Sequence, residues 1–178
     1  IENLTPTIEG GQVFEIGNFA FADAVASYTP NFGGGPTAGA GFNDPTQALL
    51  APNFSGSGEP LADENIVSLG RGGRMVLEFT NNFLTGSNDA DPDLMIFEVG
   101  DSEEVIVEIS ADGATYTNVG RASAASPTID IDAFGFDRNS RIAFVRLTDV
   151  ANQGSVDGES VGADIDAVGA ISSITAER

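Results

Sequence analysis

Acidic side chains at alternate positions are the first feature of this chain that could perform chemistry. Within residues 86–100, Asp89, Asp91 and Asp93 stand two positions apart and follow Asn88. Carboxylates about 4 Å apart repel one another by about 4 kcal/mol at an effective dielectric near 20, so such a cluster is costly unless a cation lies among its members. Ca²⁺ prefers oxygen ligands and takes about six to eight of them. We therefore predict a calcium site in this loop.

The spacing differs from that of the familiar calcium-binding motifs. Counted from Asp89, an EF-hand requires glycine at its sixth position and glutamate at its twelfth, where this chain has Leu94 and Gly100. The sequence also lacks the glycine-rich nonapeptide repeat of calcium-binding β-rolls. The remaining interpretation is an irregular loop with many oxygen ligands, which leads into a strand.

A second acidic span lies near the end of the chain, in GADIDAVGAI. Asp164 and Asp166 stand two apart, so an extended chain would place them on one face together with Val168 and Ala170. Carboxylates in line with a buried face are unfavourable without a partner. We expect either a metal ion or a buried hydrogen-bond network there.

Two further carboxylates occur in apolar surroundings. Glu98 shares a strand face with Leu94 and Ile96, so it is either a buried group with a partner or an outward residue on a solvated sheet. Asp23 lies in an apolar stretch near the N-terminus and would meet Asp166 if the first and last strands pair.

Composition excludes several classes of function. The 27 acidic residues against 7 basic ones give a net charge of −20, which repels nucleic acid and anionic membranes. The chain has neither histidine nor cysteine, which argues against zinc, copper, haem and disulfides. No apolar run reaches the roughly 18 residues that a membrane span needs. A merely solvated acidic surface, as in halophilic proteins, is the alternative to metal binding.

Short strands must position these side chains. The 178 residues are 41% hydrophobic, which suits a single domain with one core. Asp112-Gly113 supplies the turn of a hairpin, and Asp44, Pro45 and Gln47 begin the one short helix. We predict an all-β fold, a β-sandwich of the jelly-roll or galactose-binding-like kind with long loops at 30–46 and 51–63. The expected strands are 74–80, 94–99, 105–110, 116–120, 141–149 and 166–172.

Several segments together resemble a known family. Six segments spread over residues 19–173 are similar to the ligand-binding domains near the distal end of giant bacterial RTX adhesins. They are FADAVASYTP, VSLGRGGRMVLEFTNN, PDLMIFEVG, VEISADGATYTNVG, FVRLTD and GADIDAVGAI. These include the peptide-binding domain of the ice-binding adhesin. More distantly, SADGATYTNVG and FVRLTD resemble discoidin-type jelly rolls, with Tyr116 where those usually have tryptophan.

The resemblance implies a calcium-dependent, extracellular β-sandwich on the bacterial cell surface. It implies that such a domain captures C-terminal peptides of host or neighbouring-cell proteins in cell adhesion and biofilm formation, as a monomeric part of a longer chain. From the residues themselves, we expect no signal peptide in this sequence and no membrane insertion. The calcium ligands it implies are Asp23, Asp89, Asp91, Asp93, Asp164 and Asp166, to which the loop pattern adds Asn88.

A peptide's terminal carboxylate also needs a positive partner. A bound cation, an arginine or a nest of backbone N–H groups can supply it. Arg71, Gly72 and Gly73 offer such a turn within SLGRGGR, and its alternative reading is a hairpin turn with surface arginines.

Other classes of protein remain open at this stage. A carbohydrate-binding module of an adhesin is the main alternative, and a structural spacer is another. A glycoside hydrolase could use paired carboxylates such as Asp91 with Asp93, which must stand about 5 to 9 Å apart across the sugar. Because the chain has no histidine or lysine and no serine or threonine with a recognisable base, we expect no enzyme activity.

Overall fold

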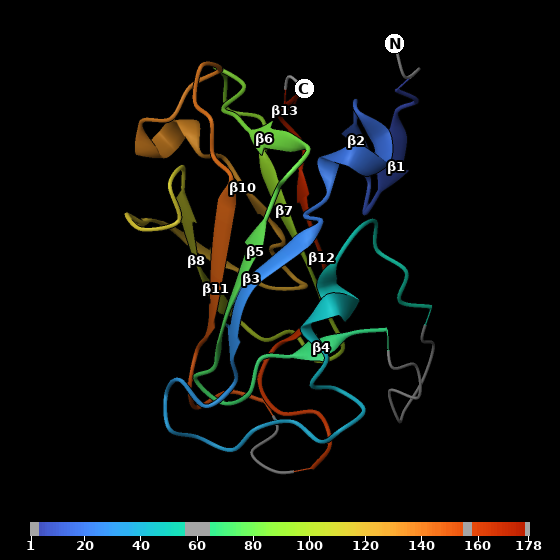
Figure 1. The fold of residues 1–178 in the computed structure, drawn as a ribbon, viewed down its shortest axis with the longest axis vertical. Helices are drawn as coiled ribbons and strands as arrows, with labels where there is room; N and C mark the ends of the chain where they lie inside the picture. Colours follow the sequence, from blue (N-terminus) through green and yellow to red (C-terminus); the bar gives the residue numbers. More distant parts are fainter. Residues whose placement is uncertain (1–3, 56–64, 155–157, 177–178) are drawn as a thin grey trace.

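The computed structural model describes residues 4–55, 65–154 and 158–176, which form an all-β sandwich (Figure 1). Two antiparallel sheets pack face to face, and their inner faces enclose the main core. The sequence-based prediction of fold class is confirmed. Among the described residues, no helix is long and apolar enough to cross a membrane.

Thirteen strands make up the sheets over the described ranges. The five-stranded sheet has the order β3 (Ala24–Thr29), β5 (Arg74–Glu78), β11 (Phe144–Asp149), β8 (Val105–Ser110) and β9 (Thr117–Ala122). The four-stranded sheet has the order β10 (Thr128–Ile129), β7 (Leu94–Val99), β12 (Asp164–Ala170) and β4 (Val67–Ser68). Two smaller sheets pair β1 (Thr7–Glu9) with β2 (Gln12–Phe14), and β6 (Asn82–Leu84) with β13 (Ser173–Thr175).

The central strands of the four-stranded sheet are buried on both faces. Leu94 and Ile96 of β7 face the inter-sheet core, whereas Met95 packs on the outer side against Phe14 and Phe21. The β1–β2 hairpin and the following 3-10 helix η1 (Gly17–Ala20) supply this outer cover (Figure 1). Strands covered on both sides read as continuous apolar runs, which explains the sequence of β7.

A β-bulge interrupts the pairing of β12 with β7. Ile165 pairs with Glu98 and Ala167 pairs with Phe97, so Asp166 is the extra residue. Ile165 and Val168 therefore both face the main core, whereas Ala167 faces the outer cluster. The expectation that Asp164 and Asp166 share a face with Val168 and Ala170 is wrong, because the bulge shifts the alternation by one residue.

All six strands predicted from the sequence are present, although most differ by a few residues at one or both ends. The helix at Asp44 is a short 3-10 helix, η2 (Pro45–Ala48), and the Asp44 side chain accepts a hydrogen bond from the Thr46 N–H at 3.0 Å. Two further 3-10 helices, η1 and η3 (Asp132–Phe134), were not expected. The predicted loop at 51–63 lies outside the described residues from position 56 onward.

Candidate metal centre

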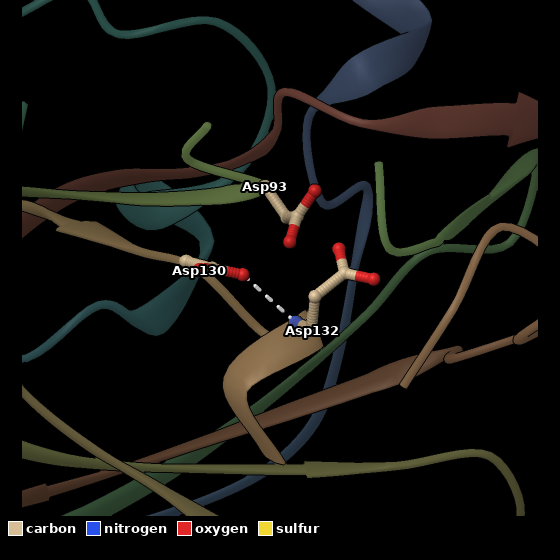
Figure 2. Close-up of side chains that lie close together, drawn as sticks. All are labelled: Asp93, Asp130 and Asp132. Atoms are coloured by element: carbon tan, nitrogen blue, oxygen red, sulfur yellow. Dashed lines mark hydrogen bonds between the residues drawn. The ribbon is translucent and has the colours of Figure 1, made fainter. Parts of the chain in front are cut away.

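Three carboxylates converge at one end of the four-stranded sheet. Asp93 immediately precedes β7, Asp130 follows β10, and Asp132 begins η3. One carboxylate oxygen from each residue lies within 4.8 Å of the others. Figure 2 shows the side chains pointing toward one another. The antiparallel pairing of β10 with β7, with Ile129 opposite Leu94, brings these residues together.

Asp93 is the buried member of this cluster, with 0% of its surface exposed. Its Oδ2 accepts a hydrogen bond from the N–H of Ile131 at 2.9 Å, whereas its Oδ1 is buried and has no hydrogen-bond partner among the described residues. Burial raises the pKa of the Asp93 carboxyl to about 6, and the nearby charges of Asp132 and Asp130 add to this increase. A cation beside Oδ1 would satisfy both the orphaned oxygen and the charge.

The backbone around Asp93 is fixed from two sides. Its N–H donates to the carbonyl of Ile129 at 2.9 Å, and its own carbonyl accepts from the N–H groups of Ile171 and Ser172 at 2.7 and 3.1 Å. These hydrogen bonds connect the backbone of Asp93 to the strand β10 on one side and to the residues that follow β12 on the other.

Asp132 is held by the loop before Asp93. Its carboxylate accepts from the N–H of Ser87 at 2.8 Å and from that of Asn88 at 3.2 Å, while Asp130 accepts from the N–H of Asp132 at 2.9 Å. A Cβ atom on Gly86 would lie 2.8 and 2.9 Å from the Asp132 oxygens. Glycine at position 86 thus allows this carboxylate to approach the loop closely.

The other loop residues predicted as ligands lie outside this cluster. Asp89 and Asp91 are exposed, and Asp89 accepts the N–H of Asp91 at 2.9 Å in a local turn. That hydrogen bond is the main cause of the lowered pKa of Asp89. The Asn88 side-chain oxygen accepts from the N–H of Arg138 at 2.9 Å. Of the loop set, the described structure brings only Asp93 into the carboxylate cluster.

The remaining predicted ligands have separate hydrogen-bond partners. Asp166 is buried and accepts from the N–H groups of Asn53 and Phe54 at 3.1 and 3.2 Å. Asp23 instead accepts from the N–H and hydroxyl of Thr80, both at 2.8 Å. Asp23 and Asp166, which the sequence would bring together only if the first and last strands pair, therefore bind different segments of the chain.

Asp164 belongs to a second group of buried acids, in which it is joined by Glu98, Glu103 and Asp149. Glu98 and Glu103 are 5% and 7% exposed, and one oxygen of each has no hydrogen-bond partner among the described residues. Burial raises the pKa of Glu98 to about 8 and that of Glu103 to about 7, and the charge of Asp164 adds to both.

Hydroxyl and amide groups satisfy much of this second group. Asp164 accepts from the hydroxyl of Ser160 at 2.6 Å and from that of Ser68. Glu98 accepts from the N–H groups of Glu103 and Ala124 at 3.3 and 2.8 Å. Of the two alternatives that the sequence left open for Asp164, a metal ion or a buried hydrogen-bond network, the described structure shows hydrogen bonds from two hydroxyl groups. Glu98 is buried, which is the first of the two alternatives considered for it.

The turn Arg71–Gly73 already holds a carboxylate of this chain. The N–H of Gly72 donates to Asp149 at 2.7 Å, that of Arg71 donates to the carbonyl of Pro36 at 3.0 Å, and that of Gly73 donates to Gly70 at 2.8 Å. The Arg71 guanidinium binds the side-chain oxygen of Asn152 at 2.8 Å. These N–H groups are engaged, so ligand binding by this turn stays a prediction that rests on the exposed part of Arg71.

Sequence reasoning missed Asp130 and Asp132, although a signal was present. The tetrapeptide Asp-Ile-Asp-Ala occurs twice, at 130–133 and at 164–167, and only the second copy was considered. The second copy supplies Asp164 to the second group of acids, whereas its Asp166 has separate partners. The first copy contributes two members of the cluster around Asp93.

The arrangement around Asp93 is suited to binding a cation through oxygen atoms. No family model matches the chain, and no curated protein sequence matches it either. The functional interpretation therefore depends on the chemistry of these sites and on the motifs in the sequence.

Proposed function

We propose that this chain is a calcium-binding, extracellular ligand-binding module of a bacterial adhesin. The observation that carries the calcium part is the orphaned, fully buried Oδ1 of Asp93 beside the carboxylates of Asp130 and Asp132. An ionised buried acid needs a compensating charge. The donor set consists of oxygen atoms, which favours a hard cation, and Ca²⁺ tolerates irregular geometry better than Mg²⁺.

The ligand that we propose is the free C-terminal peptide of a partner protein. The resemblance of several motifs to adhesin ligand-binding domains supports this class. Asp93 is fully buried, whereas Asp130 and Asp132 are half-buried, so an ion held by all three would have one protected side and one more accessible side. A terminal carboxylate can replace water on the accessible side of a calcium ion.

Calcium titration of the metal-free protein tests the metal site. We expect wild-type protein to bind calcium in calorimetry, and Asp93→Asn and Asp130→Asn each to reduce the stoichiometry or weaken binding at least tenfold. Asp91→Asn is the matched control, because Asp91 is an exposed acid of the same loop and its replacement changes the net charge equally. Unchanged binding in both cluster variants would overturn the assignment.

Matched peptides test the ligand. A short peptide with a free terminal carboxylate should bind the calcium-loaded protein with a micromolar dissociation constant, equivalent to about −8 kcal/mol. The same peptide with a terminal amide should not bind, and chelation should abolish binding of the acid. Equal affinities for the acid and the amide would reject capture of a terminal carboxylate, while leaving the calcium site unaffected.

A further inference from the structure

A groove runs across the outer face of the five-stranded sheet. Val76 of β5, together with Ala26 and Ser27 of β3, contributes to its lining, and Phe144 and Arg146 of β11 contribute from the neighbouring strand. Aromatic rings from two loops, Phe32 and Tyr116, complete the lining, and Phe32 is 53% exposed. None of these residues belongs to either group of acids.

Two arginines occupy this groove in fixed positions. The guanidinium carbon of Arg74 lies 3.7 Å from the centre of the Phe32 ring, and that of Arg146 lies 3.8 Å from the centre of the Tyr116 ring. Arg74 pairs across the strands with Thr148 and Arg146 pairs with Val76, so both arginines project from the same face. Each guanidinium group therefore lies over the face of an aromatic ring.

The two arginines differ in their hydrogen bonds. Arg146 forms a fork with Glu108, with distances of 2.7 and 2.8 Å. Arg74 donates from Nε to the hydroxyl of Thr148 at 3.0 Å. Among the arginines that the structure describes, Arg74 alone has no acceptor for either terminal nitrogen. Among the described residues, Glu108 is the one carboxylate that accepts a hydrogen bond from this pair, and the residues that line the groove include two arginines and no acid, in a chain of net charge −20.

The two arginines over their aromatic rings are suited to binding a ligand that has a carboxylate and further hydrogen-bonding groups. The free edge of a guanidinium binds a carboxylate through two parallel hydrogen bonds. The backbone groups of β5 and β11 are paired on both sides, whereas β3 is an edge strand of this sheet. A peptide that added as a strand would lie along the free edge of β3 and not across this face. Exposed hydroxyls of Ser27 and Thr29 beside aromatic rings instead match the alternating polar and apolar surfaces of a sugar.

We propose that this groove binds a sugar residue that carries a single carboxylate, a uronic acid, with Arg74 as the group that holds the carboxylate. A single carboxylate is specified because the net charge of −20 opposes the approach of a polyanion. This binding activity does not depend on the metal centre, and it would give the module a second ligand class.

The test compares methyl glucuronide with methyl glucoside, which differ in the carboxylate. We expect methyl glucuronide to perturb the NMR signals of Arg74 and Val76. Its dissociation constant should be at least tenfold lower than that of methyl glucoside. Arg74→Gln should weaken glucuronide binding at least tenfold, and Arg74→Lys should have an intermediate effect because it keeps the charge but lacks the planar fork. Arg121→Gln is the matched control, because Arg121 is a surface arginine that pairs with Glu104.

All measurements are made in saturating calcium, with folding of each variant checked by circular dichroism. Equal binding of the two sugars, or unchanged glucuronide binding by Arg74→Gln, would overturn the proposal. An acetylated dipeptide acid that displaces glucuronide and binds more tightly at Arg74 would assign the groove to peptide carboxylates and would also overturn it. None of these outcomes bears on calcium binding at Asp93.

Discussion

The side chain of Asp93 accepts a hydrogen bond at 2.9 Å from the backbone N–H of Ile131, a residue 38 positions further along the chain. This hydrogen bond connects the residue before β7 to the turn that contains Asp130 and Asp132. One oxygen of Asp93 is therefore used for positioning, and the other remains available for an ion.

Replacement of Asp93 should have opposite effects with and without calcium. In saturating calcium, Asp93→Asn should lower the melting temperature by roughly 10 °C, because an ion at about a thousandfold excess over its dissociation constant contributes about 4 kcal/mol. In metal-free protein the same change should be neutral or stabilising, because it removes a buried charge of which one oxygen has no hydrogen-bond partner among the described residues. Thermal melts of both forms measure this, with Asp91→Asn as control. An equal loss in both conditions would show that Asp93 has a structural role alone.

The metal-free protein should lose stability as the pH rises from about 5 to 8. The pKa values of Glu98 and Glu103 are about 8 and about 7 in the folded state, above the ordinary value of a glutamate. The folded state therefore binds more protons than the unfolded state in this window, so the free energy of unfolding falls with rising pH. Urea unfolding at several pH values measures this slope. Glu98→Gln should flatten it, and a slope of opposite sign in metal-free wild-type protein would contradict the prediction.

Calcium affinity should fall as the pH is lowered through about 6. Burial holds the pKa of Asp93 near that value, and a carboxyl group must lose its proton before it binds a cation. Each unit of pH below the pKa should weaken binding by up to about tenfold for this one proton. Calorimetric titrations at pH 7.5, 6.5 and 5.5 would follow the change. Constant affinity over this range would place the calcium ligands elsewhere.

Gly73 should be required for folding rather than for ligand binding. A Cβ atom at this position would lie 1.7 Å from the carbonyl oxygen of Leu69, an overlap that the backbone must move to relieve. Gly73→Ala should therefore cost several kcal/mol, roughly the upper range of single substitutions. Gly34→Ala is the control, because Gly34 has a φ of +75° but open space around its Cβ position. Denaturant unfolding that gave equal losses for the two variants would exclude the overlap as the cause.

The fold was largely predictable because short strands and turns leave local signals. β-Branched and aromatic runs marked six of the seven strands that have five or more residues, and Asp112-Gly113 marked the β8–β9 hairpin. The seventh, β3, was not predicted. Strands of two or three residues, such as β4 and β10, have too few positions to show alternation. Their existence depends on neighbours that are distant in sequence.

The candidate site was predictable only in part. Asp93 was identified from its acidic loop, but its partners lie about forty residues away and are brought close by the β10–β7 pairing. The bulge at Asp166 could not be predicted either, because a search for alternating polar and apolar residues assumes a regular strand. Asp93 also differs from Asp89 and Asp91 in burial. All three are aspartates at alternate positions, but Asp93 is buried and the other two are exposed to solvent.

The bulge in β12 means that deletion of one residue there would keep the two faces of the strand in place. Removal of a residue from a regular strand moves every following side chain to the opposite face. Deletion of Asp166 would instead join Ile165 directly to Ala167, whose partners Glu98 and Phe97 are already adjacent in β7. Val168 would still face the main core. The bulge at Asp166 is thus the position in β12 where removal of one residue leaves the core-facing side chains facing the core and the outward side chains facing outward.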